Sequence, residues 1–156
     1  MATGHEIAMA LRAAYLAMHR RSDAQFARHG VTADQFVILT ALAGGGAVTQ
    51  RDLARRTLSD PNTARAMLLL LEKRGLIART PDPADGRVRS VALTPKGGQA
   101  YRALWKAGEP VRARLLASLG PGEPDALLDL LGRVTRAMGP TDEPDARTRV
   151  PSRTRS

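Results

Sequence analysis

Apolar residues recur at helical spacing over most of the chain, and one short stretch shows the two-residue alternation of strands. A first helix is predicted over residues 5–28, with Gly30 as its stop. A second helix follows Thr32, which forms a capping box with Gln35 three residues later. The apolar face of the first helix consists of Ile7, Leu11, Ala14, Tyr15 and Met18, and that of the second of Phe36, Leu39 and Leu42 or Ala43.

A short helix and a longer one make up the middle of the pattern. The short helix is predicted over residues 50–56, with Thr49 and Asp52 as a second capping box. The longer helix is predicted over residues 61–74, with Asp60 as its N-cap. Its buried face is expected to consist of Ala64, Met67, Leu68 and Leu71.

Two strands are predicted next, over residues 76–80 and 88–94, with alternation in the second strand. The linker over residues 81–87 contains turn residues, and Pro83 and Gly86 are expected to shape it. This order of elements predicts a mainly α protein with a small β-hairpin.

The C-terminal part returns to helical patterning. A long helix is predicted over residues 95–118 with a kink or break at Pro110, and an amphipathic helix over residues 125–138. Residues 1–4 are expected to form a flexible N-terminus. The segment 139–156 has few apolar residues, so we expect a disordered, basic C-terminal tail.

Composition narrows the functional classes. The chain has 156 residues, about the size of one domain, and a net charge of +9. Such an excess favours a polyanionic partner, although a merely positive surface is the plainer interpretation. Cysteine is absent, which excludes disulfides and thiolate chemistry. No apolar run approaches the length of a membrane span, and the N-terminus lacks signal-peptide features, so we expect a cytoplasmic protein.

No catalytic or metal-binding pattern stands out in the sequence. His5, His19 and His29 lack metal-ligand spacing on a shared face. No Ser/His/Asp set, phosphate loop or paired carboxylates can be recognised. We therefore expect neither an enzyme nor a cofactor.

The order of elements in the middle of the chain is that of a winged helix-turn-helix. In such modules the second helix of the pair enters the major groove of double-stranded DNA. Asn62, Thr63, Arg65 and Ala66 face outward near its start. Asparagine can make two hydrogen bonds to adenine and arginine two to guanine, and Thr63 can meet a thymine methyl group or a phosphate.

Helix starts also suit phosphate oxygens, because their backbone N–H groups are unpaired. The start of the short helix adds the polar side chains of Thr49, Gln50 and Arg51. The same argument applies to Thr32 and Ser59. Asn62 and Arg65 could also be ordinary helix-surface residues.

The run LARRTLSDPNTARAMLLLLEKRGLIARTPDPADGRVRSVALTPKGGQAY resembles the multiple-antibiotic-resistance regulator (MarR) family of bacterial repressors. Three marks carry the resemblance: Leu-Glu-x-x-Gly-Leu-Ile at 71–77, the Asp-x-Arg of Asp85 and Arg87, and Leu-Thr-x-x-Gly at 93–97. With the flanking helices, the resemblance covers roughly residues 5–138.

The resemblance implies a single domain with a winged helix-turn-helix over about 32–94. Dimerisation helices, over about 5–30 and 95–138, would interlock in a homodimer. The wing would lie against the minor groove, with Arg87 inserted and held by a salt bridge to Asp85. A small aromatic or phenolic effector would bind between the dimerisation helices and the DNA-binding part and release the DNA.

The predicted DNA-binding residues are Thr32, Thr49, Gln50, Arg51, Ser59, Asp60, Asn62, Thr63, Arg65, Asp85, Arg87 and Arg89. For Arg87 we favour insertion into the minor groove over a solvated charge on the wing. Arg89 could equally contact DNA or be an ordinary exposed strand residue. Tyr15, His19, Phe36 and Trp105 could line the effector pocket, although aromatic residues at helical spacing are more often core.

The sequence departs from the family at two places. Ala66 stands where relatives often have a basic or polar residue, and Leu69 and Leu70 extend an apolar run where relatives are often polar. We therefore expect an operator that differs from those of better-known members, although packing could also explain the leucines. The lack of cysteine excludes the thiol-sensing branch.

The function that this pattern favours is a sequence-specific transcriptional regulator, a homodimeric repressor on a pseudo-palindromic operator that a small ligand releases. The alternative is a winged-helix module that binds small molecules or proteins without reading DNA.

Overall fold

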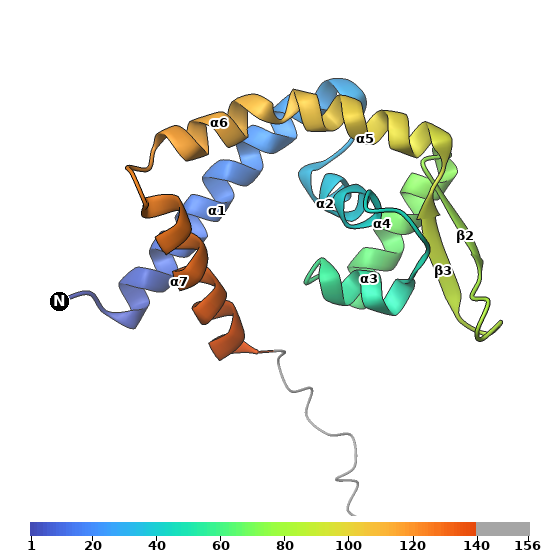
Figure 1. Ribbon diagram of the computed structural model, residues 1–156, viewed down its shortest axis with the longest axis horizontal. Helices are drawn as coiled ribbons and strands as arrows, with labels where there is room; N and C mark the ends of the chain where they lie inside the picture. Colours follow the sequence, from blue (N-terminus) through green and yellow to red (C-terminus); the bar gives the residue numbers. More distant parts are fainter. Residues whose placement is uncertain (140–156) are drawn as a thin grey trace, which may run out of the picture. The chain divides into compact units, whose positions relative to one another are not determined.

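A computed structural model describes residues 1–139, and the tail predicted over residues 139–156 lies outside them except for Gly139. The described part is mainly helical, with one small antiparallel sheet (Figure 1). Its elements are α1 (Gly4–Phe26), the 3₁₀ helix η1 (Ala27–His29), α2 (Ala33–Leu42), β1 (Val48–Thr49), α3 (Gln50–Arg56), α4 (Pro61–Lys73), β2 (Ile77–Pro81), β3 (Arg89–Leu93), α5 (Pro95–Ala107), α6 (Glu109–Ala117) and α7 (Glu123–Met138).

The chain forms two compact units, the first over Met1–Arg114 and the second from Leu115 onward. The first contains the helices and strands of the winged helix-turn-helix together with α1 and α5. The second is formed around α7. The single domain predicted over residues 5–138 stays a prediction.

Local capping signals place most helix starts where the sequence predicted them. Thr32 and Gln35 form the predicted capping box of α2. Asp60 caps α4, and Thr94 caps α5 by accepting the N–H of Gly97. The second capping box is only half formed. The Thr49 hydroxyl accepts the N–H of Asp52, but the Asp52 side chain does not accept the N–H of Thr49.

Helix α1 begins at Gly4 because Thr3 and Glu6 form a capping box of their own. It ends at Phe26, two residues before the predicted end, and continues as η1. Gly30 then stops the helical path with a left-handed φ of 64°, as predicted.

The sheet has three strands, one more than the sequence predicted. Its order is β1-β3-β2, with β3 antiparallel to both neighbours. Val48 pairs with Val91 and is buried with it. A two-residue strand has too few positions to show alternation, so only its pairing with β3 reveals β1.

The long helix predicted over residues 95–118 is interrupted. The structure ends α5 at Ala107 and begins α6 at Glu109, so the break precedes Pro110. Proline cannot donate to the carbonyl four residues earlier, and its ring clashes with that carbonyl, so continuous helix ends ahead of it.

One apolar core holds the first unit together. It is built mainly from aliphatic side chains of α2, α3, α4 and the sheet: Ile38, Leu39, Leu42, Leu53, Leu68, Leu71, Ile77 and Val91 are nearly inaccessible to solvent. Arg79 of β2 forms an ion pair with Glu72 of α4. The hairpin is thereby tied to the recognition helix predicted from the sequence.

Candidate nucleic-acid interface

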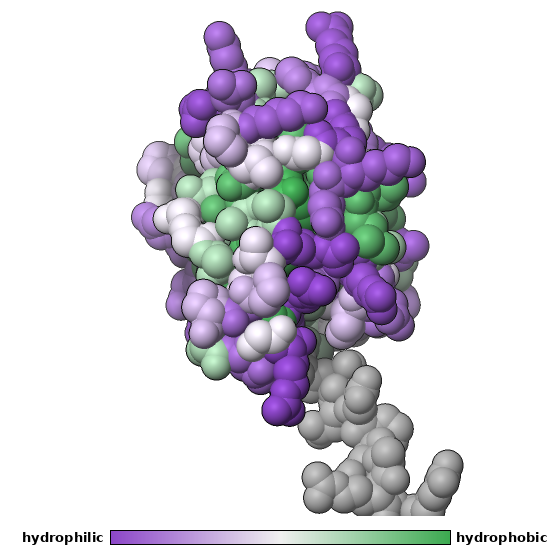
Figure 2. Space-filling model, turned by 90° about the vertical axis from the view of Figure 1, so that its right-hand side faces the viewer, coloured by the Kyte–Doolittle hydropathy of each residue, from purple (hydrophilic) through white to green (hydrophobic). Residues whose placement is uncertain are grey.

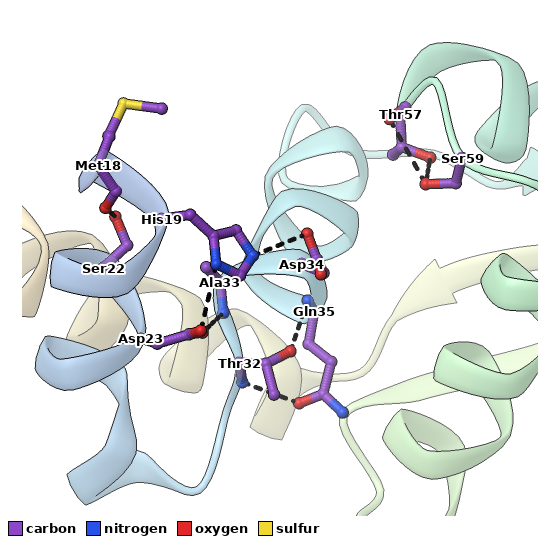
Figure 3. Close-up of polar contacts among 10 residues, drawn as sticks. All are labelled: Met18, His19, Ser22, Asp23, Thr32, Ala33, Asp34, Gln35, Thr57 and Ser59. Atoms are coloured by element: carbon purple, nitrogen blue, oxygen red, sulfur yellow. Dashed lines mark hydrogen bonds and ion pairs between the residues drawn. The ribbon is translucent and has the colours of Figure 1, made fainter. Parts of the chain in front are cut away.

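The turn between α3 and α4 is fixed by its own hydrogen bonds. The Thr57 hydroxyl donates to the Leu53 carbonyl at 2.8 Å and is paired with the Ser59 hydroxyl at 3.0 Å, as Figure 3 shows for the latter pair. Leu58 adopts a left-handed φ of 52°. Non-glycine residues rarely adopt this conformation, so the turn sets a definite angle between the two helices.

The polar side chains at the starts of α3 and α4 meet in one place. Gln50, Arg51, Asn62 and Arg65 line a shared depression of about 370 Å³. Arg51, Asn62 and Arg65 are exposed. Within residues 1–139 none of these three side chains takes part in an ion pair. They are therefore free to meet a ligand with many hydrogen-bond acceptors.

Other predicted contact residues near this depression already serve the fold. Asp60 accepts the N–H of Thr63 at 2.9 Å and also lies 3.3 Å from its hydroxyl. The hydroxyls of Thr49 and Ser59 are bonded within the chain as well. A carboxylate repels phosphate, so the structure gives Asp60 the role of a cap.

Asp82, which the sequence pattern did not single out, organises the tip of the hairpin. Its carboxylate accepts the Ser90 hydroxyl at 2.7 Å and the N–H groups of Ala84 and Asp85 at 2.9 and 3.2 Å. The Ser90 bond, followed by the two backbone bonds, lowers the pKa of Asp82 below its usual value. An Asp-Pro-x-Asp stretch is an Asx-turn signal that could have pointed to it.

Asp85 holds the backbone of Arg87. Its carboxylate accepts the Arg87 N–H at 3.0 Å, and the ion pairs of the described residues do not include one between these two side chains. The guanidinium groups of Arg87 and Arg89 are exposed. Gly86 has no left-handed φ, and a Cβ there would meet nothing within 4 Å. The hairpin is therefore shaped by the aspartates and does not need Gly86.

The start of α2 has an acidic environment. His19 of α1 places Nδ1 3.3 Å from Asp23 and Nε2 3.3 Å from Asp34, and Asp23 accepts the N–H of Ala33 at 2.6 Å (Figure 3). A phosphate would meet these two carboxylates. We therefore leave Thr32, beside Ala33, out of the proposed interface.

The four predicted effector residues fall into two groups. Tyr15 packs against His19 with ring centroids 5.5 Å apart. Partial burial and the nearby Asp34 and Asp23 carboxylates raise the pKa of Tyr15. The His19 Nδ1 contact with Asp23 lies within α1, and the Nε2 contact with Asp34 links α1 to α2.

Phe36 and Trp105 belong to the second group, an aromatic row that runs through Tyr101. Centroid distances are 5.8 Å from Phe36 to Tyr101 and 6.2 Å from Tyr101 to Trp105. The Arg112 guanidinium lies 3.9 Å from the centre of the Trp105 ring. Phe36 also borders a shallow, mainly apolar depression of about 440 Å³ that includes Arg56.

The face that carries the hairpin is mostly hydrophilic, with hydrophobic surface visible between projecting side chains (Figure 2). No helix within residues 1–139 is long and apolar enough to cross a membrane. The same residues bring together no group of three His, Asp or Glu side chains able to hold a metal.

Comparison with known proteins decides the family. A family model described as MarR family matches residues 29–88. The transcriptional regulator HosA of Escherichia coli O111:H- is 31% identical over 107 residues, which cover 69% of this chain and 79% of HosA. The chain belongs to the MarR family. Membership makes this MarR-family protein a DNA-binding transcriptional regulator and not an enzyme.

Two further similarities extend this result. The HTH-type transcriptional repressor NicR of Pseudomonas putida is 34% identical over 104 residues, which cover 67% of this chain and 66% of NicR, just under two thirds. The structure of Bordetella bronchiseptica BpsR, whose DNA binding is regulated by 6-hydroxynicotinic acid, matches with a TM-score of 0.75 and 31% identity, over 83% of this chain and 98% of BpsR. The winged-helix fold predicted from the sequence is confirmed.

Proposed function

We propose that this MarR-family protein is a repressor that binds a specific operator as a homodimer. The observation that carries the proposal is the convergence of Gln50, Arg51, Asn62 and Arg65 on one depression at the starts of α3 and α4. Asparagine and arginine are the residues that read adenine and guanine with paired hydrogen bonds. Acting on DNA, the protein would work in the cytoplasm.

Exposed apolar faces support the homodimer. On α1, Ile7 and Met18 are 49% and 40% exposed, and on α7 the exposed apolar side chains include Leu131, Val134 and Met138. Contiguous apolar faces of this kind mark interaction surfaces. A two-fold dimer would present two copies of α4, so the operator would be a pseudo-palindrome with half-site centres about 10 bp apart.

Release by a small aromatic ligand is the finer part of the proposal. BpsR responds to 6-hydroxynicotinic acid, an aromatic carboxylate. In this chain the depression beside Phe36 offers apolar walls together with the Arg56 guanidinium, which is suited to a carboxylate. This depression between α2 and α3 shares Phe36 with the effector pocket of Tyr15, His19, Phe36 and Trp105 predicted from the sequence, whereas Tyr15, His19 and Trp105 do not line it.

Variants of the depression test DNA reading directly. On a duplex recovered by selection from random sequences, Asn62→Ala and Arg65→Ala should each weaken binding by about 1–3 kcal/mol and relax preference at one base position. Arg28→Ala in η1 removes the same charge as Arg65→Ala from outside the depression and serves as the control. Affinity unchanged by both depression variants would contradict the proposal and favour a winged module that does not read DNA.

A further inference from the structure

The outer side of α4 carries an apolar patch formed by Ala66, Leu69 and Leu70. Leu69 is 48% exposed and Leu70 is 54% exposed, whereas Leu68 and Leu71 are buried in the core. At about 100° per residue, Ala66 and Leu69 follow Asn62 on the side of the helix opposite its buried face. Packing within the chain therefore accounts for only part of the run from Met67 to Leu71.

The patch is continuous with the polar interface. Ala66 directly follows Arg65, and Asn62 lies one helical turn before Ala66. Asn62 and Arg65 line the depression shared with Arg51 of α3. An apolar partner protein would have to accommodate these cationic and amide groups at the edge of its contact, whereas DNA suits both kinds of surface.

The major-groove edge of DNA offers one apolar group that such a patch can contact, the 5-methyl group of thymine. A G·C pair presents only hydrogen-bond donors and acceptors there, and leucine side chains would cover these without replacing their bonds to water. An A·T pair that directs its methyl group toward the helix buries apolar surface on both sides.

We propose that the apolar patch of α4 reads thymine methyl groups in each operator half-site. This inference rests on the proposed function, since it requires α4 to lie in the major groove. Asn62 and Arg65 then read bases through hydrogen bonds, and Leu69 and Leu70 select neighbouring thymines by apolar contact. Each half-site is therefore expected to contain bases that Asn62 and Arg65 read through hydrogen bonds, next to one or more thymines.

Deoxyuridine substitution tests the inference on the unmodified protein. Deoxyuridine pairs as thymidine does but lacks the methyl group. Replacing one contacted thymine of the selected duplex should weaken binding about fourfold, the effect of one buried methyl group. Replacing thymines outside both half-sites should leave the affinity unchanged and controls for altered duplex stability.

Leu69→Gln and Leu70→Gln identify the reading residue. The loss of affinity that deoxyuridine causes in the wild-type protein should be absent in at least one of these surface variants. Their circular dichroism spectra should match the wild type, which shows that the fold is kept. The inference is overturned if no half-site substitution affects wild-type binding, or if both variants keep the full sensitivity. Failure to recover any preferred duplex would instead count against the proposed function, so the two failures are distinguishable.

Discussion

Asp82 and Asp85 shape the tip of the hairpin through hydrogen bonds to backbone N–H groups and, for Asp82, to the Ser90 hydroxyl. The Asp82 carboxylate accepts hydrogen bonds from the Ser90 hydroxyl and from the N–H groups of Ala84 and Asp85. The Asp85 carboxylate accepts the N–H of Arg87. The family resemblance had implied a salt bridge between Asp85 and Arg87, and the structure shows a bond to the backbone of Arg87 instead. Both aspartates thereby restrict the segment from which Arg87 projects.

The lowered pKa of Asp82 predicts how the hairpin tip responds to acid. Because the folded pKa lies below the unfolded one, the ionised carboxylate stabilises the tip at all pH values above the ordinary aspartate pKa of about 3.9. This contribution is lost as the pH falls through the folded pKa. In NMR titrations the amide signals of Ala84 and Asp85 should shift with a midpoint below about 3.9. A midpoint at or above that value would contradict the assignment.

Arg87 is expected to contribute to DNA affinity more than a generic surface arginine. Arg87→Ala should weaken operator binding by about 1 kcal/mol or more, and should lower the salt slope by about one for each phosphate that the guanidinium neutralises. Arg28→Ala is the matched control, with a much smaller effect. Binding measured across salt concentrations separates groove insertion from phosphate neutralisation. Unchanged affinity at every salt concentration would show that Arg87 is only a solvated charge.

At the scale of elements, the junction of α4, β2 and α5 depends on close backbone packing. The N–H of Thr94 donates to the Leu76 carbonyl at 3.1 Å. A Cβ on Gly97 would lie 1.8 Å from the same carbonyl oxygen. The hairpin can therefore join α5 at this angle only with glycine at position 97.

Two neighbouring glycines give a matched test of that junction. Gly97→Ala should lower the free energy of unfolding by about 3 kcal/mol or more, because the clash involves backbone. Gly98→Ala should raise it by about 0.5–1 kcal/mol, because its Cβ would meet only the end of the Arg102 side chain, at 3.7 Å, within a helix. Urea denaturation of both variants measures the contrast. Equal effects would mean that α5 can shift away from β2.

Local signals explain which elements could be predicted from the sequence. Thr32, Asp60 and Thr94 cap their helices through residues three positions away, so the sequence contains the whole signal. Strand β1 depends on a partner more than 40 positions away along the chain, at Val91, and no local pattern announces it. The break before Pro110 was expected, and only its exact position differed.

The sequence predicted which residues belong to the candidate site better than it predicted how they come together in space. Asn62 and Arg65 follow from helix periodicity once the recognition helix is located. Their convergence with Gln50 and Arg51 depends on the angle of the Leu58 turn. That angle is a tertiary property, as is the contact of His19 Nε2 in α1 with Asp34 in α2.

At the scale of the whole molecule, α7 presents an apolar stripe formed by the exposed side chains of Leu128, Leu131, Val134 and Met138, and the proposed homodimer would supply its partner surface. Leu131→Glu should convert the proposed homodimer into monomers and abolish tight operator binding, because a charge would have to be buried in the interface. Arg136→Glu places the same side chain on the opposite side of the helix and should preserve the dimer. Light scattering after gel filtration reports the mass. If both variants remain dimers, α7 is not part of the dimer interface.

Selection from random duplexes, followed by titration at physiological salt, is the decisive measurement for sequence-specific DNA binding. We expect recovery of a pseudo-palindrome with half-sites about 10 bp apart, bound about a thousandfold or more tightly than a scrambled duplex. Equal, weak affinity for recovered and scrambled duplexes would contradict sequence-specific regulation by this protein.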